Sequence, residues 1–190
     1  MKTVNPSLSD EELSELVKKN DEQAFALLID RYESRLLRYG RKFLSDRGDI
    51  EDMVQTVFVK AYQNIKSFDS ARKFSPWIYR IAHNVFVNAL RDKSKNPTVS
   101  LDLDLLVSHP VDETYIEAEK NEETRTYIDR GLRQLPPAYR EVLTLFYFEE
   151  LDYQAIADVL HIPVGTVGVR LRRAREVLRK YFDANRGNSL

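Results

Sequence analysis

Apolar residues recur at spacings of three and four along most of the chain, which is the period of α-helices that bury one face. The longest run of this kind extends from Phe25 to Phe43, and Asp21 stands before it as a suitable N-cap. A shorter pattern over residues 13–17 precedes it, and no segment shows a convincing strand alternation. The pattern therefore predicts an all-α fold.

Two further helices are expected before the pattern breaks down. After the interruption "SDRGD", the segment "IEDMVQTVFVKAYQNI" places Ile50 and Val57 on one face. The segment "FDSARKFS" interrupts the pattern again. Ser75 as N-cap and Pro76 at the first helical position then predict the start of the helix "WIYRIAHNVFVNALRDK". We expect residues 1–95 to form one small helical domain.

The segment "NPTVSLDLDLLVSHPVD", which begins at Asn96, has no stable period and contains two prolines. Its alternation of leucine and aspartate would suit a strand, but a single strand in an all-helical protein has nothing to pair with. We therefore expect an extended acidic linker over residues 96–114, followed by a second helical domain over residues 115–190.

The second domain is expected to end in a helix-turn-helix. The sequence "LPP" breaks a first helix, and the helices that follow are predicted at 137–149, 152–160 and 164–182. The last two are separated by the tight turn "HIPV", and Asp152 can cap the first of them. On the last helix Val167, Leu171, Ala174, Leu178 and Phe182 share one face, and Val169, Arg172, Arg173, Glu176 and Lys180 lie opposite.

A solvated surface is the more common explanation of a single arginine-rich helix. Here a capped helix and a short turn come before it, and residues at the start of such a second helix reach bases and phosphates in the major groove. The arrangement therefore favours DNA binding.

The composition excludes several other classes of protein. With 43% apolar and 31% charged residues the chain resembles ordinary soluble domains, and it has neither a signal-like start nor an apolar run of membrane-spanning length. We expect a soluble, cytoplasmic protein. There is no cysteine, the three histidines are scattered, and no phosphate loop, nucleophile motif or paired histidine and carboxylate is present. We therefore expect no enzymatic activity, metal, cofactor or small-molecule substrate.

Charge is strongly segregated although the net charge of the chain is only −1. Residues 60–95 carry eight basic and two acidic groups, residues 96–123 carry one basic and eight acidic groups, and residues 124–190 carry eleven basic and eight acidic groups. Two positive blocks on either side of an acidic one indicate two modules that bind a polyanion, joined by a spacer that does not.

Four segments, in their order and separation, resemble the bacterial extracytoplasmic-function (group IV) sigma factors. They are "DIEDMVQTVFVKAYQNIKSFD", "KFSPWIYRIAHNVFVNALRD", "LRQLPPAYREVLTLFYFEELDYQAIADVL" and "IPVGTVGVRLRRAREVLRK", within a similarity that runs from about Asp21 to Tyr181. The resemblance implies sigma domain 2 and sigma domain 4, which bind core RNA polymerase and recognise the −10 and −35 promoter elements. It also implies a regulatory partner, an anti-sigma factor, which in this family is often anchored in the membrane.

By this resemblance, the outward face of the helix that contains Ile50 contacts core polymerase. The family often has glutamate where Thr56 stands, and an acid at the start of this helix also complements its dipole, which is sufficient to explain Asp49. The residues assigned to this contact are Asp49, Asp52, Gln55 and Val59.

The resemblance likewise assigns −10 recognition to the loop "KSFDSARKF" and the helix after it. Asn84 and Asn88 are expected to contact base edges, arginines and Lys73 to bind phosphates, and either Phe68 or Asp69 to form the wall of a pocket for an extruded base. Trp77 is expected either to stack on a base or to belong to the core. The full set is Ser67, Phe68, Asp69, Lys73, Trp77, Arg80, Asn84, Asn88 and Arg91.

Contact with the −35 element is assigned to Thr166, Gly168, Val169, Arg172 and Arg173. Close relatives usually have a basic residue at the position of Gly168. The glycine is therefore explained by loss of a phosphate contact, by closer approach of the helix to a neighbour, or by neutral drift.

The acidic residues of the linker also have two explanations. They keep the linker soluble, or they mimic phosphate groups inside the polymerase. They are Asp102, Asp104, Asp112 and Glu113.

Two other functions fit parts of this sequence. One is a transcriptional regulator that binds duplex DNA through its C-terminal helices without core polymerase. The other is a sigma-like protein that has lost promoter function. The first is distinguished by whether the protein alone binds a promoter, and the second by whether transcription starts at all.

Overall fold

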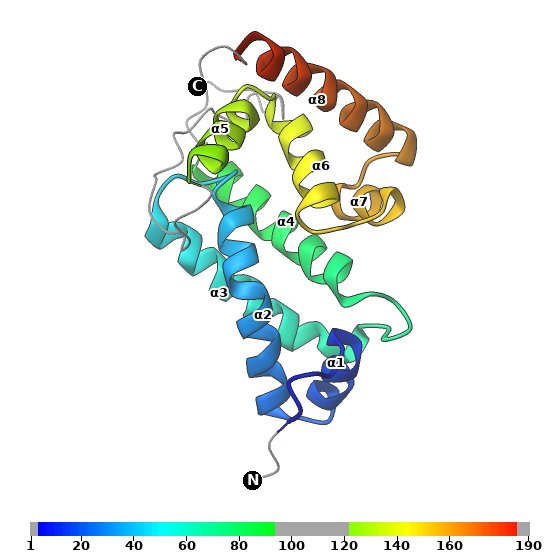
Figure 1. The fold of residues 1–190 in the computed structure, drawn as a ribbon. Coiled ribbons are helices and arrows are strands. Elements are labelled where there is room, and N and C mark those ends of the chain that lie inside the picture. Colours follow the sequence, from blue (N-terminus) through cyan, green and yellow to red (C-terminus); the bar gives the residue numbers. More distant parts are fainter. Residues whose placement is uncertain (1–3, 94–121, 186–190) are drawn as a thin grey trace. The chain divides into compact units, whose positions relative to one another are not determined.

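The computed structural model describes residues 4–93 and 122–185. Every element of secondary structure within these two ranges is helical, which confirms the expected all-α fold (Figure 1). The chain divides into two compact units, the first formed by residues 4–93 and the second formed mainly by residues 122–185. The predicted linker and its acidic residues Asp102, Asp104, Asp112 and Glu113 lie outside the described residues.

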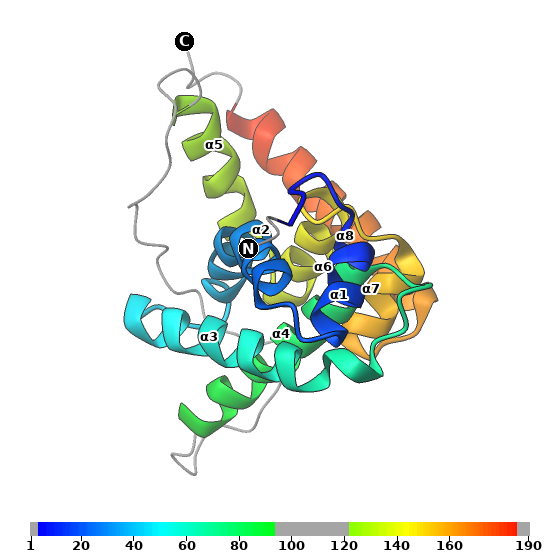
Figure 2. The same cartoon turned by 90° about the horizontal axis from the view of Figure 1, so that it is seen from below.

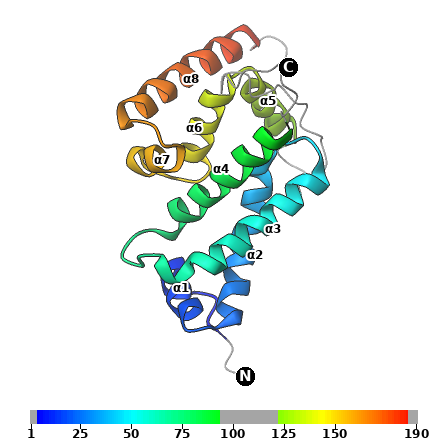
Figure 3. The ribbon, with the colours of Figure 1, turned by 180° about the vertical axis from the view of Figure 1, so that it is seen from behind.

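The first unit contains α1 (Asp10–Lys18), α2 (Glu22–Gly40), α3 (Arg47–Asn64), the short 3-10 turn η1 (Ile65–Ser67) and α4 (Phe74–Lys93). Helix α3 packs against both α2 and α4, and α1 packs against α2 (Figures 1 and 3). The residues that the helical period places inward form the core. They include Leu28, Tyr32, Leu36 and Tyr39 on α2, Val54 and Val57 on α3, and Tyr79, Ala82 and Phe86 on α4.

One close approach in this core requires a glycine. A Cβ atom added to Gly40 would lie 2.4 Å from the ring of Phe86. A side chain at this position would displace the aromatic core between α2 and α4.

Side-chain caps fix most helix starts in this unit. The Asp21 carboxylate accepts hydrogen bonds from the backbone N–H groups of Gln23 and Ala24 at 3.0 and 3.1 Å, which confirms the predicted cap. Asp46 caps α3 in the same way, so that this helix begins at Arg47, earlier than the apolar pattern indicated.

The predicted start of α4 is wrong. The helix begins at Phe74, so Ser75 already lies inside it and is not the N-cap. The Phe74 N–H group instead donates to the carboxylate of Glu11 on α1 at 2.9 Å. A side chain far away in the sequence therefore replaces the local cap.

The second unit contains α5 (Glu122–Arg133), α6 (Pro137–Tyr147), α7 (Tyr153–Leu160) and α8 (Val164–Asn185). Helix α8 packs against α6 and α5 (Figure 3). The prolines end α5 as predicted, whereas the predicted helical residues 115–121 lie outside the described part of the chain.

The half-buried Arg140 stabilises the corner between α5 and α6. Its guanidinium donates to the carbonyl oxygens of Leu132, Arg133 and Leu135 at 2.9 to 3.2 Å, and burial lowers the pKa of this arginine. It thereby joins the last turn of α5 to the residues that lead into α6.

Candidate nucleic-acid interface

Helix α4 presents a polar flank to solvent. Arg80, Asn84, Asn88 and Arg91 are exposed, as the sequence pattern predicted. The opposite side of the helix is buried, and its His83 ring lies 3.3 Å from the Tyr39 hydroxyl. The core therefore fixes the rotation of α4 and directs two amides and two guanidinium groups outward.

The segment that leads from η1 into α4 has its own hydrogen bonds. The exposed Asp69 carboxylate accepts from the Ala71 N–H group at 3.1 Å and forms an ion pair with Arg72 at 3.6 Å. The Ser67 hydroxyl donates to the Asn64 carbonyl oxygen at 2.7 Å, and Lys73 is exposed. The structure thus exposes three of the predicted −10 residues here, Ser67 at the end of η1 and Asp69 and Lys73 in the loop that follows.

Phe68 lies inside the loop and not on its surface. Its side chain is only 4% exposed, and its ring lies 5.5 Å from that of Phe74 and 5.0 Å from that of Trp77. Asp69 is therefore the surface residue of the pair, and the assignment of either residue to the wall of a pocket for an extruded base stays a prediction. Trp77 is half-buried at the edge of the same aromatic cluster.

A second exposed surface runs along α3. Asp52, Gln55 and Val59 lie on it, and Val59 is 54% exposed, whereas Asp49 is half-buried. Tyr62, 41% exposed, extends this surface by one further turn and was missed by the sequence analysis. The signal was available, because two large apolar residues three positions apart on an outward face are unusual for a solvated helix.

Helices α7 and α8 form the predicted helix-turn-helix (Figure 3). Asp152 caps α7 by accepting from the Ala155 N–H group at 2.8 Å, which confirms the predicted cap. His161 ends α7 in the left-handed conformation with φ 54°, and the tight turn follows directly. Val167 on α8 is fully buried.

The outward face of α8 carries the predicted −35 residues. Val169, Arg172 and Arg173 are exposed, and Thr166 is half-buried. Both arginines have partners within the unit. Arg172 forms an ion pair with Glu176 at 3.0 Å, and Arg173 donates to the Tyr139 hydroxyl of α6 at 3.2 Å. These exposed contacts are weak enough to be exchanged for phosphate contacts.

Gly168 is not required by the packing of the helix-turn-helix. A Cβ atom added there would meet only the ring of Tyr153, at the ordinary contact distance of 3.6 Å. Its backbone φ is not positive, so a side chain would cause no backbone strain. The explanation of a closer approach between α7 and α8 therefore does not hold.

The second unit also has an apolar pocket that the sequence analysis missed. Its volume is about 310 Å³, and Tyr147, Phe148, Leu178 and Phe182 are among its lining residues. Tyr147 and Phe148 are 52% and 45% exposed. Exposed apolar surfaces of this kind are typical of sites that contact another protein.

Within residues 4–93 and 122–185, no group of three or more histidine or carboxylate side chains is placed to hold a metal ion. Over the same ranges, no helix is both long enough and apolar enough to cross a lipid bilayer.

Comparison with known protein families gives two matches in this chain. Residues 28–96 match the family model described as Sigma-70 region 2, and residues 125–178 match the one described as Sigma-70, region 4. The first match covers the polar flank of α4 and the exposed surface of α3. The second covers the helix-turn-helix.

Relatives over nearly the whole chain agree with these matches. The ECF RNA polymerase sigma factor SigW of Bacillus subtilis is 38% identical over 86% of this chain and 91% of its own length. The ECF RNA polymerase sigma-E factor of Escherichia coli K12 is 34% identical over 92% of this chain and 95% of its own length.

Among solved structures, CnrH in complex with the cytosolic domain of CnrY is similar over 93% of this chain and 98% of that chain, with a TM-score of 0.64 and 25% identity. RpoE from Bartonella quintana, solved with the anti-sigma factor NepR, has a TM-score of 0.66 at 20% identity over 84% of this chain and 96% of that chain, which shows the shared fold.

Proposed function

The chain belongs to the extracytoplasmic-function RNA polymerase sigma factors, and from this premise we propose which of its surfaces perform each step of initiation. As a sigma factor it is not an enzyme, and it directs core RNA polymerase to promoters. We set aside the alternative of a regulator that acts without core polymerase, because that function would not explain the match of residues 28–96 to Sigma-70 region 2.

The first unit is assigned to core polymerase and the −10 element. This assignment is supported by the two surfaces that one small helical unit exposes. One consists of Asp52, Gln55 and Val59 on α3, and the other is the amide and guanidinium flank of α4. Carboxylate, amide and apolar groups suit a protein partner, whereas asparagines and arginines suit bases and phosphates. We assign residues 1–95 to sigma domain 2 on this basis.

The second unit is assigned to the −35 element, and residues 115–190 to sigma domain 4, with the linker over residues 96–114. We propose that the start of α8 enters the major groove. Val169 then contacts a thymine methyl group, and Arg172 and Arg173 bind phosphates or base edges. Core polymerase and promoter DNA are thus the two principal partners.

An anti-sigma factor is proposed as a third partner. CnrH, which resembles this chain over nearly its whole length, was solved in complex with the cytosolic domain of another protein. We place the activity in the cytoplasm, where bacterial polymerase and DNA meet.

Run-off transcription tests this function. Purified core polymerase and genomic fragments are incubated with and without the protein, and discrete transcripts are expected only when it is present. Their absence with active core polymerase would support the sigma-like protein that has lost promoter function.

Replacing Asn84 by alanine is expected to slow open-complex formation by about fivefold or more while leaving the initial closed complex nearly unchanged. The physical reason is that an amide on the exposed flank contacts the −10 region only as the strands separate. Permanganate reactivity of unpaired thymines measures opening, and a template with a pre-melted bubble should restore much of the activity.

The matched control for this variant is Gln23→Ala, which removes an exposed amide from α2 in the same unit. It should open promoters at the wild-type rate. An equal loss for Asn84→Ala on duplex and bubble templates would show that Asn84 acts in binding single strands and not in melting.

Introducing arginine at Gly168 is expected to strengthen binding to −35 DNA and to steepen its salt dependence by about one phosphate contact. The structure has room for a Cβ atom at this position, and removing a glycine from the helix adds up to about 1 kcal/mol of stability. Fluorescence anisotropy of holoenzyme on labelled −35 duplex at several salt concentrations measures both effects.

Gly168→Ala separates the two contributions, because it stiffens the helix without adding charge. Its salt dependence should match that of the wild type. If Gly168→Arg is folded but no longer binds promoters, the glycine serves close approach to DNA and the lost-contact explanation is wrong.

A further inference from the structure

Helix α1 lies beside the loop that joins η1 to α4, as Figures 1, 2 and 3 agree. Three residues on one face of α1 make the contact. Glu11 accepts from the Phe74 N–H group at 2.9 Å, and Lys18 places its Nζ atom 5.8 Å from the centre of the Phe68 ring. Glu15, between them, hydrogen-bonds with Lys18 and Ser70, and these contacts lower the pKa of its carboxyl group.

The spacing of these three residues explains why they act together. Positions i, i+4 and i+7 of a helix share one face, so that Glu11, Glu15 and Lys18 all point toward the segment 68–74. The contacts cover this segment from its buried aromatic ring, Phe68, to the first residue of α4, Phe74.

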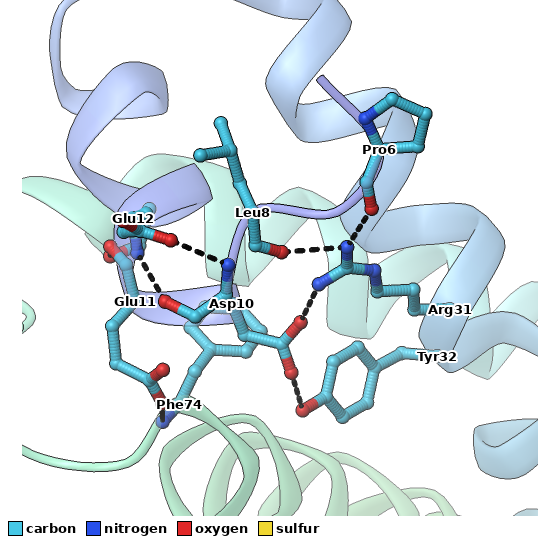
Figure 4. A network of polar contacts seen from close by, with 10 residues as sticks. Pro6, Leu8, Asp10, Glu11, Glu12, Arg31, Tyr32 and Phe74 are labelled. Carbon is cyan, nitrogen blue, oxygen red and sulfur yellow. Dashed lines mark hydrogen bonds and ion pairs between the residues drawn. The ribbon is translucent and has the colours of Figure 1, made fainter. Parts of the chain in front are cut away.

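Helix α1 is itself held firmly against the core. Figure 4 shows the Asp10 carboxylate accepting from Arg31 and from the Tyr32 hydroxyl, both at 2.5 Å. Arg31 also donates to the carbonyl oxygens of Pro6 and Leu8, at 2.6 and 2.7 Å. Burial and the bond to Asp10 raise the pKa of Tyr32, which therefore stays a neutral donor at physiological pH.

Glu11 supplies a hydrogen-bond acceptor that the start of α4 lacks locally. The first N–H groups of a helix have no intrahelical partner, and Lys73, which precedes α4, has no acceptor in its side chain. A carboxylate at this end also complements the helix dipole. Glu11 therefore fixes the point at which the loop turns into the helix that carries Trp77 and Arg80.

We propose that α1 is a positioning element for −10 recognition and that Glu11 is its principal positioning residue. In this proposal Glu11 does not touch DNA, but it holds the loop 68–74 in the conformation that receives an unpaired −10 base. The proposal rests on the assignment of this loop to the −10 element made above. It concerns a helix outside the Sigma-70 region 2 match, which begins at residue 28.

The test is binding of holoenzyme to a labelled single-stranded oligonucleotide that carries the non-template −10 sequence of a promoter found by run-off transcription. Glu11→Ala is expected to weaken this binding by about threefold to tenfold, which corresponds to the usual net contribution of one hydrogen bond. Glu11→Gln keeps an acceptor oxygen and should recover most of the affinity. Affinity for core polymerase and for −35 duplex should stay unchanged.

Glu12→Ala is the matched control. Glu12 is the next residue of the same helix and also accepts from a backbone N–H group, that of Ser9, at 2.7 Å. It caps α1 itself and not α4. A similar loss of thermal stability in the two alanine variants, with weaker −10 binding only in Glu11→Ala, supports the positioning role.

Two results would overturn the proposal while leaving the proposed function intact. In the first, Glu11→Ala binds the oligonucleotide as the wild type does. In the second, Glu11→Ala and Glu12→Ala lose binding equally, which would mean that the bond from Glu11 to Phe74 only stabilises the fold. Wild-type holoenzyme that does not bind the oligonucleotide at all would instead contradict the assignment of this unit to the −10 element.

Discussion

Replacing Arg173 by alanine is expected to lower the affinity of holoenzyme for −35 duplex DNA by about tenfold or more. The side chain is exposed on the outward face of α8, the helix that we propose enters the major groove. A guanidinium contact with a base or phosphate contributes about 1–3 kcal/mol, and the lost charge should reduce the salt slope by about one. Anisotropy titrations at several salt concentrations measure both quantities.

Arg179→Ala is the control for this prediction. Arg179 is also an exposed arginine of α8, it lies further along the helix, and it has an acidic partner in Asp183 at 3.8 Å. Its replacement should leave −35 affinity nearly unchanged. Equal losses in both variants would mean that α8 attracts DNA through its overall charge and that Arg173 has no specific contact.

Tyr139 provides a further check on the same contact. Its hydroxyl accepts the hydrogen bond from Arg173 and so restrains the guanidinium before DNA binds. If this restraint helps recognition, Tyr139→Phe should weaken −35 binding less than Arg173→Ala does, and it should have no effect in the Arg173→Ala background.

Replacing both Asp52 and Gln55 by alanine is expected to weaken the association with core polymerase by about tenfold to a hundredfold. Both side chains are exposed on α3, beside Val59 and Tyr62, and central residues of protein interfaces commonly contribute more than about 1 kcal/mol each. Since neither side chain belongs to the core, the helical spectrum and thermal midpoint should change little.

Association is measured by titrating labelled core polymerase with the protein. The matched control combines Glu33→Ala with Gln23→Ala, which removes an exposed acid and an exposed amide from α2. If the Asp52 and Gln55 double variant keeps its helical spectrum and binds core polymerase with wild-type affinity, the assignment of α3 to the polymerase contact is wrong.

The sequence pattern predicted the helices well because their stability depends on apolar faces that are periodic in the sequence. Asp21 and Asp152 were correctly predicted as caps, since an N-cap bonds to residues two or three positions away. The outward residues of α3, α4 and α8 followed from the same periodicity.

The sequence pattern could not predict contacts that depend on tertiary packing. Ser75 was wrongly chosen as the cap of α4 because the actual acceptor, Glu11, lies 63 positions earlier. The partner of Arg173 lies 34 positions away on α6. The burial of Phe68 could not be predicted from the sequence of a polar loop either, because it results from packing against Phe74 and Trp77.

Footprinting on a promoter from the run-off assay tests the central claim, that this chain recognises both promoter elements as part of a holoenzyme. With core polymerase, the protein is expected to protect the −10 and −35 elements together and to make the −10 region reactive to permanganate. Without core polymerase, neither element should be protected at the same concentration. Protection of duplex DNA by the protein alone, or holoenzyme that protects neither element, would show that the chain does not recognise promoters in this way.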